Sequence, residues 1–177
     1  MKKMKFSVLS GAYVNAGDFL IVKRTIDLLK HIYPNCEIKE YKRDKDLEEY
    51  LEEINKTDAL ILAGGPAYIK DLYPNIIPLV KDLDKVKTKI VTIGLGWYGS
   101  KTDINYIKNY LFTNETIKLL KRIVKDSKNL ACRDWYSVKA LTFNNLTDTL
   151  MTGCPAWYNI NKINELYLRN GGGNTIV

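Results

Sequence analysis

Strand-like and helix-like segments alternate along nearly the whole chain. Short apolar runs predict six strands, at residues 5–10, 37–41, 59–63, 89–93, 130–132 and 149–152. Between them, apolar positions spaced three and four apart predict helices at residues 18–33, 44–55, 76–83, 115–128 and 134–141. This alternation indicates an α/β fold, with a doubly wound, mostly parallel, Rossmann-like sheet and right-handed crossovers.

Two of these segments predict how the layers pack. The run from Ala59 to Ala63 is continuously apolar, as is typical of a central parallel strand that is buried on both faces. The first helix has one apolar face, which we expect to lie against the sheet. That face comprises Phe19, Val22, Ile26, Leu29 and Tyr33.

The composition excludes several classes of protein. With 46% hydrophobic residues, the chain is too apolar to be intrinsically disordered. No run approaches the roughly 20 apolar residues of a membrane span. The apolar run after the lysine-rich start, Phe6 to Leu9, is shorter than the about 7–15 residues that a signal peptide needs. We therefore expect a globular, cytoplasmic protein.

The charge favours anionic partners without identifying one. Lys and Arg number 27 against 20 Asp and Glu, a net charge of +7. A basic stripe on the helix at 115–128 is interpreted as a solvated face; it comprises Lys118, Lys121, Arg122, Lys125 and Lys128. No nucleic-acid motif accompanies it, so no nucleic-acid partner is predicted. Peripheral association with the anionic inner face of a membrane would be consistent with this charge.

Cysteine and histidine are too sparse for a metal centre. The three cysteines, Cys36, Cys132 and Cys154, are widely spaced, and His31 is the single histidine. A zinc site needs a cluster of such ligands. We therefore predict no metal and no cofactor, and we expect reduced, buried thiols.

Candidate chemistry lies where the predicted strands end, because ligands of open parallel sheets bind at the carboxyl edge. The loop after the first strand contains Asn15, Gly17 and Asp18. Gly17 permits a tight turn, and Asp18 could cap the following helix. Alternatively, Asn15 and Asp18 hydrogen-bond a polyhydroxyl substrate, or Asp18 acts as a general base.

Glycines end the third and fourth predicted strands. Gly64 and Gly65 permit either the close approach of a ligand or a tight structural turn. Gly94 and Gly96 precede Trp97, whose ring could stack on a sugar. The alternative is a mobile loop with Trp97 folded back on the core.

The fifth predicted strand is followed by Arg133, Asp134 and, one turn later, Ser137. Arg133 would lie beside a helix N-terminus, and its planar guanidinium suits a phosphate or a carboxylate. The alternative is structural: an ion pair from Arg133 to Asp18 or Asp134 that holds the loops together.

In this order, the segments resemble the polysaccharide pyruvyl transferase family. The resemblance covers roughly residues 5 to 157, and its most specific parts are Asn15-x-Gly17-Asp18 and Arg133-Asp134-x-x-Ser137. The other matching segments are Asp58 to Gly65, Ile93 to Gly96, and Gly153-Cys154-Pro155-Ala156. One departure is Pro66, which stands where a third glycine commonly follows in the family.

The resemblance implies one half of a two-domain enzyme of the GT-B type. Residues 1–170 would form the N-terminal domain, on the acceptor side, and residues 171–177 would be a linker and the start of a truncated second domain. Members transfer a pyruvyl group from phosphoenolpyruvate to a sugar of a cell-surface polysaccharide or its precursor, which can be lipid-linked. The donor-binding basic residues would lie largely in the other half, so this chain alone would be an incomplete pyruvyl transferase.

For this chemistry, Asp18 is the candidate catalytic base. The candidate substrate-binding residues are Asn15, Gly17, Gly64, Gly65, Gly94, Gly96, Trp97, Arg133, Asp134 and Ser137. Two other functions stay open: a glycosyltransferase with a nucleotide-sugar donor on the same architecture, and a non-catalytic module that binds sugar or phosphate.

Overall fold

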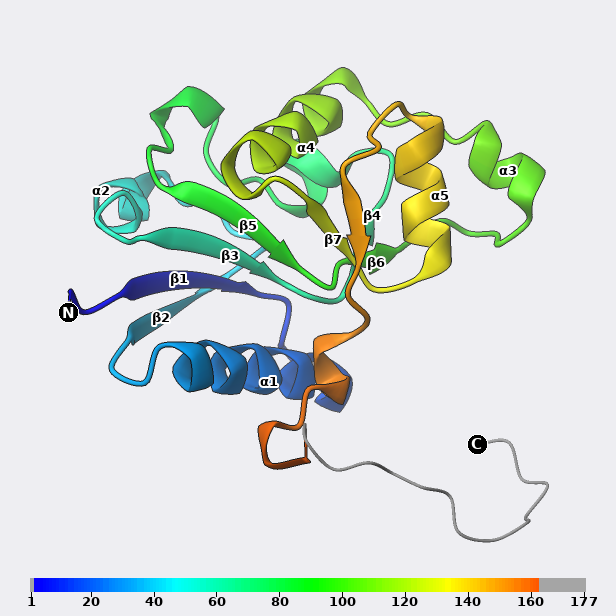
Figure 1. The fold of residues 1–177 in the computed structure, drawn as a ribbon. Coiled ribbons are helices and arrows are strands. Elements are labelled where there is room, and N and C mark those ends of the chain that lie inside the picture. The colour runs from blue at the N-terminus through cyan, green and yellow to red at the C-terminus, as the bar shows by residue number, and fades with distance from the viewer. Residues whose placement is uncertain (1, 163–177) are drawn as a thin grey trace, which may run out of the picture.

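The computed structural model describes residues 2–162 and contains a central sheet of four parallel strands in the order β2-β1-β3-β5 (Figure 1). Their bounds are β1 (Lys5–Ser10), β2 (Glu37–Lys42), β3 (Ala59–Ala63) and β5 (Lys89–Ile93). The parallel pair β7 (Leu130–Cys132) and β8 (Thr149–Met151) continues the sheet beyond β5. Backbone hydrogen bonds join the two parts: Leu95 N donates to Ala131 O at 3.2 Å and Arg133 N to Leu95 O at 2.7 Å.

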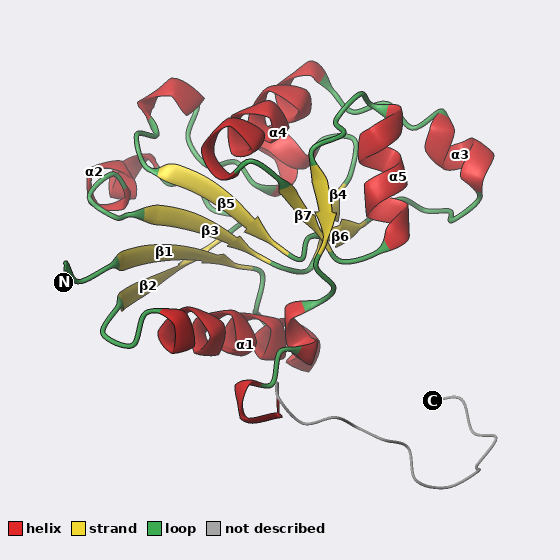
Figure 2. Cartoon of the chain, viewed as in Figure 1, coloured by secondary structure: helices red, strands yellow, loops and turns green. Residues whose placement is uncertain are grey.

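Helices cover both faces of this sheet, as Figure 2 shows. The helix α1 (Ala16–Ile32) lies on one face, and α4 (Asn114–Ser127) lies on the opposite face. The remaining α-helices within residues 2–162 are α2 (Leu51–Ile54), α3 (Ile104–Lys108) and α5 (Trp135–Phe143). The predicted α/β, mostly parallel, Rossmann-like fold is therefore confirmed.

The alternation of side chains along β3 divides the core into two layers. Leu60 and Leu62 belong to the large apolar cluster on the α4 side of the sheet. Ala59, Ile61 and Ala63 point to the other face, where a smaller cluster includes Leu29 of α1. Every residue of β3 is buried, as the continuous apolar run predicted.

Two predicted helices are wrong in extent. The segment predicted as a helix at 44–55 forms only a 3-10 turn, Glu48–Tyr50, followed by the single turn of α2. The backbone N–H of Leu47 donates to Leu79 O at 2.7 Å, so a neighbouring segment holds it outside any helix. Residues 77–82 are not helical either; a π-helical turn ends at Ile76 (Leu72–Ile76) and a 3-10 turn begins at Leu83 (Leu83–Lys85). Pro78 lacks the N–H that a helix interior needs, and Leu79 adopts a φ of 50°.

The buried face of α1 is also rotated relative to the prediction. Its buried residues are Ile21, Val22, Thr25 and Leu29. Phe19 and Tyr33, which were expected to pack on the sheet, are 51% and 40% exposed. The three-and-four spacing fits both faces, because adjacent positions on this helix are also apolar.

Two short strands were not predicted. The strands β4 (Pro66–Tyr68) and β6 (Gly96–Trp97) pair in parallel just beyond the ends of β3 and β5. They follow glycines with positive φ, at Gly64, Gly65 and Gly94, where the chain turns out of the central sheet. Within residues 2–162, no helix combines the length and the apolar character needed to cross a membrane. The predicted linker at 171–177 lies outside the described residues.

Candidate functional site

The candidate site is the carboxyl edge of the sheet, where the arrows of β1, β3 and β5 end in Figure 1. The loops that follow β1, β3, β5 and β7 all begin at this edge, because the strands are parallel. The N-terminal ends of α1 and α5 follow two of these loops directly. Helix N-termini attract negative charge, so the edge is suited to an anionic ligand.

Asn15, rather than Asp18, caps α1. The side-chain oxygen of Asn15 accepts a hydrogen bond from Gly17 N at 2.9 Å. The capping role considered for Asp18 is therefore wrong. The Asp18 side chain is half-buried in the first turn, and its carboxylate has no hydrogen-bond or ion-pair partner among residues 2–162. That carboxylate is available to a substrate, which the role of general base requires.

Asp134 holds the segment after β7 in place. Its Oδ1 accepts from Ser137 N at 2.8 Å and from Ser137 Oγ at 2.9 Å, which caps α5. Its Oδ2 accepts from Trp97 N at 3.2 Å and lies 3.6 Å from Arg133 Nε. Of the two ion pairs considered for Arg133, the structure contains the one with Asp134. Ser137 is fully buried and supports Asp134; direct contact of these residues with substrate stays a prediction.

The space beside Gly64 and Gly94 is filled by the chain itself. A Cβ atom on Gly64 would lie 2.4 Å from Ile21 Cγ2, and one on Gly94 would lie 2.5 Å from Gly153 O. Pro155 closes over both glycines, at 3.4 Å and 2.6 Å from the same Cβ positions. These two glycines allow the turn after β8 to pack against α1 and the sheet, so the structural alternative accounts for them.

Two other niches hold arginines. A Cβ atom on Gly96 would lie 2.5 Å from Nε and Nη2 of Arg133. A Cβ atom on Gly65 would lie 2.9 Å from Nη1 of Arg43, which comes from the end of β2. Arg43 was not predicted as a site residue from the sequence. The one indication in the sequence was that Arg43 directly follows β2, a strand that ends at the same carboxyl edge of the sheet.

Trp97 lies in the core rather than in the solvent. The side chain is 8% exposed, its Nε1 donates to Lys101 O at 3.0 Å, and its ring meets Tyr110 edge-on at 4.7 Å. The indole therefore cannot serve as an open stacking platform. Tyr98, the next residue, is 52% exposed.

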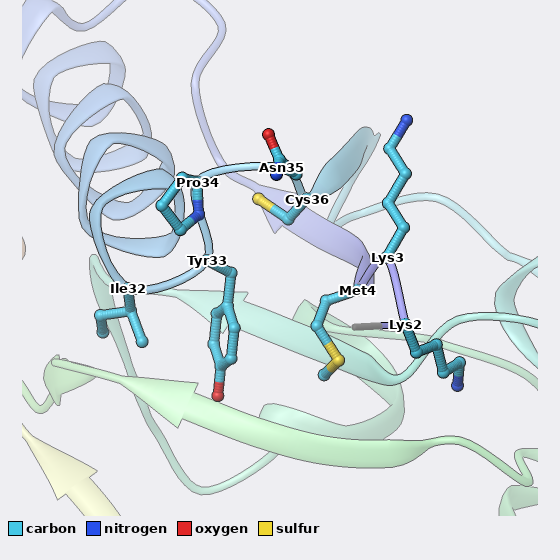
Figure 3. Close-up of a pocket in the computed structure, with 8 residues that line it drawn as sticks. All are labelled: Lys2, Lys3, Met4, Ile32, Tyr33, Pro34, Asn35 and Cys36. Carbon is cyan, nitrogen blue, oxygen red and sulfur yellow. The ribbon is translucent and has the colours of Figure 1, made fainter.

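A cavity of about 450 Å³ lies at the other end of the sheet (Figure 3). Its lining runs from Lys2 to Met4, before β1, and from Ile32 to Cys36, between α1 and β2. Lys2 is paired with Asp58 at 2.6 Å, and Lys3 with Glu37 at 2.8 Å. This is the amino edge of the sheet, where no helix N-terminus and no unpaired arginine contributes, so we do not place the site there.

The cysteines differ in environment. Cys132 is fully buried, and this burial raises the pKa of its thiol to about 12. Cys36 and Cys154 are half-buried. Within residues 2–162 no three His, Cys, Asp or Glu side chains gather in a way that could hold a metal ion.

The fold and this edge define an α/β protein that carries Arg43 and Arg133 at the ends of its parallel strands. The sequence profile of the polysaccharide pyruvyl transferase family matches residues 15–174. The chain therefore belongs to the polysaccharide pyruvyl transferase family, as the motifs at this edge had indicated.

One solved structure supports the fold. The functionally uncharacterised protein KP1_0663 from Klebsiella pneumoniae subsp. pneumoniae NTUH-K2044 aligns with a TM-score of 0.50 and 20% identity, over 90% of this chain and 53% of that chain. The chain thus spans about half the length of that relative. GanP, a glucose-galactose binding protein from Geobacillus stearothermophilus, aligns over 86% of this chain and 58% of that one at 11% identity; its TM-score of 0.35 carries no argument. A comparison with curated proteins gives no match.

Proposed function

We propose that this chain takes part in transferring a pyruvyl group from phosphoenolpyruvate to a sugar of a cell-surface polysaccharide or its precursor. The match to the family over residues 15–174 is the observation that carries this proposal. Two features of the site support it: an unpaired carboxylate at Asp18, and a half-buried guanidinium at Arg133 beside a helix N-terminus. A sugar hydroxyl needs a base, and the donor carries a carboxylate and a phosphate that need cations.

The reaction we propose forms a ketal. A proton is added to the methylene carbon of phosphoenolpyruvate, which leaves an oxocarbenium-like centre at the adjacent carbon. One sugar hydroxyl attacks that centre, and a second hydroxyl of the same sugar then displaces phosphate. The two hydroxyls lose two protons in total. One of these replaces the proton taken up by the methylene carbon, and the other leaves with phosphate.

Asp18 is the proposed base, and Arg133 the proposed contact to an anionic group. The guanidinium of Arg133 is held by Asp134 on one side and by the Gly96 backbone on the other, so its orientation is fixed before substrate binds. Such pre-orientation lets a cation stabilise developing charge without first reorganising. The acceptor is expected to enter along the loop of Tyr98, whose ring is exposed.

The test is pyruvyl transfer by the full-length protein, followed by phosphate release and by the mass of the sugar product. We expect Asp18→Asn to lower kcat by at least about 100-fold, the usual contribution of a general base, with the fold unchanged. Glu52→Gln removes an exposed carboxylate on α2, at the opposite edge, and is the matched control. Near-normal turnover by Asp18→Asn would show that Asp18 is not the base.

Donor titration separates this proposal from the other two functions. Phosphoenolpyruvate should raise the melting temperature of the full-length protein, whereas a panel of nucleotide sugars should leave it unchanged. Stabilisation by a nucleotide sugar alone would favour a glycosyltransferase. Stabilisation by phosphoenolpyruvate without any product would favour a binding module.

A further inference from the structure

Arg43 extends along the carboxyl edge and crosses two strand ends. Its backbone N–H donates to Ser10 O at 2.9 Å, which fixes it beside the end of β1. A Cβ atom on Gly11 would lie 2.7 Å from both Nε and Cζ of Arg43, and one on Gly65 would lie 2.9 Å from Nη1. The guanidinium therefore reaches from β2 over the end of β1 to the end of β3, lying against two residues that have no side chain.

This guanidinium has no acceptor among residues 2–162, although it is half-buried. The carboxylate next to it in the sequence, Asp44, accepts from the Tyr13 hydroxyl instead. Arg122 shows how this chain satisfies a structural arginine: its guanidinium donates to the Asp126 carboxylate at 2.8 Å and to Val86 O at 2.9 Å. An arginine has five N–H donors, so the guanidinium of Arg43 has N–H groups to offer to a ligand.

We propose that Arg43 binds a phosphate or carboxylate group of a substrate at the carboxyl edge, beside the niche that holds Arg133. The two niches are neighbours, because Gly96 N donates to Gly65 O at 2.9 Å. The planar fork of a guanidinium binds either anion through two parallel hydrogen bonds. The proposal rests on the proposed function in one respect, the identity of the substrate that carries the anionic group. That substrate is either the phosphoenolpyruvate donor or a phosphorylated sugar acceptor.

The first experiment measures the affinity of the chain for inorganic phosphate by NMR titration of backbone amides. Arg43→Gln removes the guanidinium. Gly11→Ala keeps every charge but places a methyl group 2.7 Å from the present position of the guanidinium, whose flexible end can move aside without unfolding the chain. Lys45→Gln is the matched control, since it removes an exposed positive charge two residues away.

We expect phosphate to shift the amides of Gly11, Arg43 and Gly65 in the wild-type chain. Arg43→Gln and Gly11→Ala should each weaken phosphate binding by about tenfold or more, which is typical of losing a charge-assisted hydrogen-bonded contact. Lys45→Gln should change it by less than about twofold, because exposed charges contribute little. Equal affinity in Arg43→Gln and wild type, or an equal loss in Lys45→Gln, would overturn the proposal, as would the absence of phosphate binding by the wild-type chain.

The second experiment identifies the source of the anion, using pyruvyl transfer by the full-length protein. A raised KM for phosphoenolpyruvate in Arg43→Gln assigns the subsite to the donor, and a raised KM for the sugar acceptor assigns it to the acceptor. Unchanged KM values with normal transfer would refute the subsite and leave the proposed function intact. Arg43-dependent phosphate binding in a protein that transfers no pyruvyl group would refute the proposed function and leave the anion site intact.

Discussion

Replacing Asp134 with alanine should destabilise the fold, because its carboxylate accepts three hydrogen bonds at the carboxyl edge. The carboxylate caps α5 through Ser137 N at 2.8 Å, and losing such a cap costs about 1 kcal/mol. The buried Ser137 hydroxyl, at 2.9 Å, and Trp97 N, at 3.2 Å, would lose their acceptor as well, at about 1 kcal/mol each. Since neighbouring losses overlap, we expect a total of about 2–3 kcal/mol.

The assay is urea unfolding followed by circular dichroism, with melting temperature as a second readout. A loss of about 2–3 kcal/mol should lower the melting temperature by about 5–10 °C in a chain of this size. Asp134→Asn is the matched variant, because asparagine caps helices as well as aspartate does. Its one carbonyl oxygen keeps the hydrogen bonds from Ser137, whereas its amide group loses the acceptor of Trp97 N at 3.2 Å and the ion pair with Arg133 at 3.6 Å. It should cost about 1 kcal/mol, less than the alanine variant.

Two results would refute this reasoning. If Asp134→Ala costs less than about 0.5 kcal/mol, the three hydrogen bonds do not hold the edge together. If Asp134→Asn costs as much as Asp134→Ala, the second carboxylate oxygen stabilises the edge and the cap does not. A double variant with Ser137→Ala adds a further check. It should cost less than the sum of the two single variants, because both remove the same hydrogen bond.

Two further predictions concern the glycines and the thiols. Gly94→Ala should cost about 2–4 kcal/mol in urea unfolding, since its φ is 57° and its Cβ would lie 2.5 Å from a backbone oxygen. Gly96→Ala should cost less than about 1 kcal/mol, because only the Arg133 side chain has to move, yet it should reduce pyruvyl transfer. An equal loss of unfolding free energy in Gly94→Ala and Gly96→Ala would contradict this account. Iodoacetamide at mildly alkaline pH should leave Cys132 unmodified in the folded chain, because burial raises its pKa to about 12, and mass spectrometry should find it modified only after denaturation. Labelling of Cys132 as fast as that of Cys36 would show that the strand β7 opens readily.

The sequence predicted the parts of the fold that depend on local pattern. The strands β1, β3, β5 and β7 were placed correctly, because a short run of apolar residues bounded by glycine or a charged residue is typical of a buried strand. The helix predicted at 76–83 failed because prolines and a left-handed residue outweigh apolar spacing. The buried face of α1 could not be chosen, since adjacent apolar residues give two faces that satisfy the same period.

The basic stripe on α4 shows a second limit. Lys118, Lys121, Lys125 and Lys128 are exposed, as a solvated face requires. Arg122, in the same stripe, instead donates to the carbonyl oxygens of Val86 and Thr88 at 2.9 Å and 3.2 Å. Val86 and Thr88 lie between the 3-10 turn Leu83–Lys85 and β5, which are distant from α4 in the sequence. The charge pattern alone therefore could not show that Arg122 is structural whereas the lysines are solvated.

The glycines at the carboxyl edge show why the site itself was only half predictable. A glycine at a strand end signals that something approaches closely, but the sequence does not say what. At Gly64 and Gly94 the occupant is the chain itself, through Ile21 and Pro155. At Gly65 and Gly96 it is a guanidinium, brought from β2 and from the end of β7. A glycine at a strand end thus marks a packing contact at Gly64 and Gly94, and a guanidinium packed against the backbone at Gly65 and Gly96. A guanidinium that lies against backbone can still present its outer N–H groups, and for this reason we propose that an anionic substrate binds at the second pair.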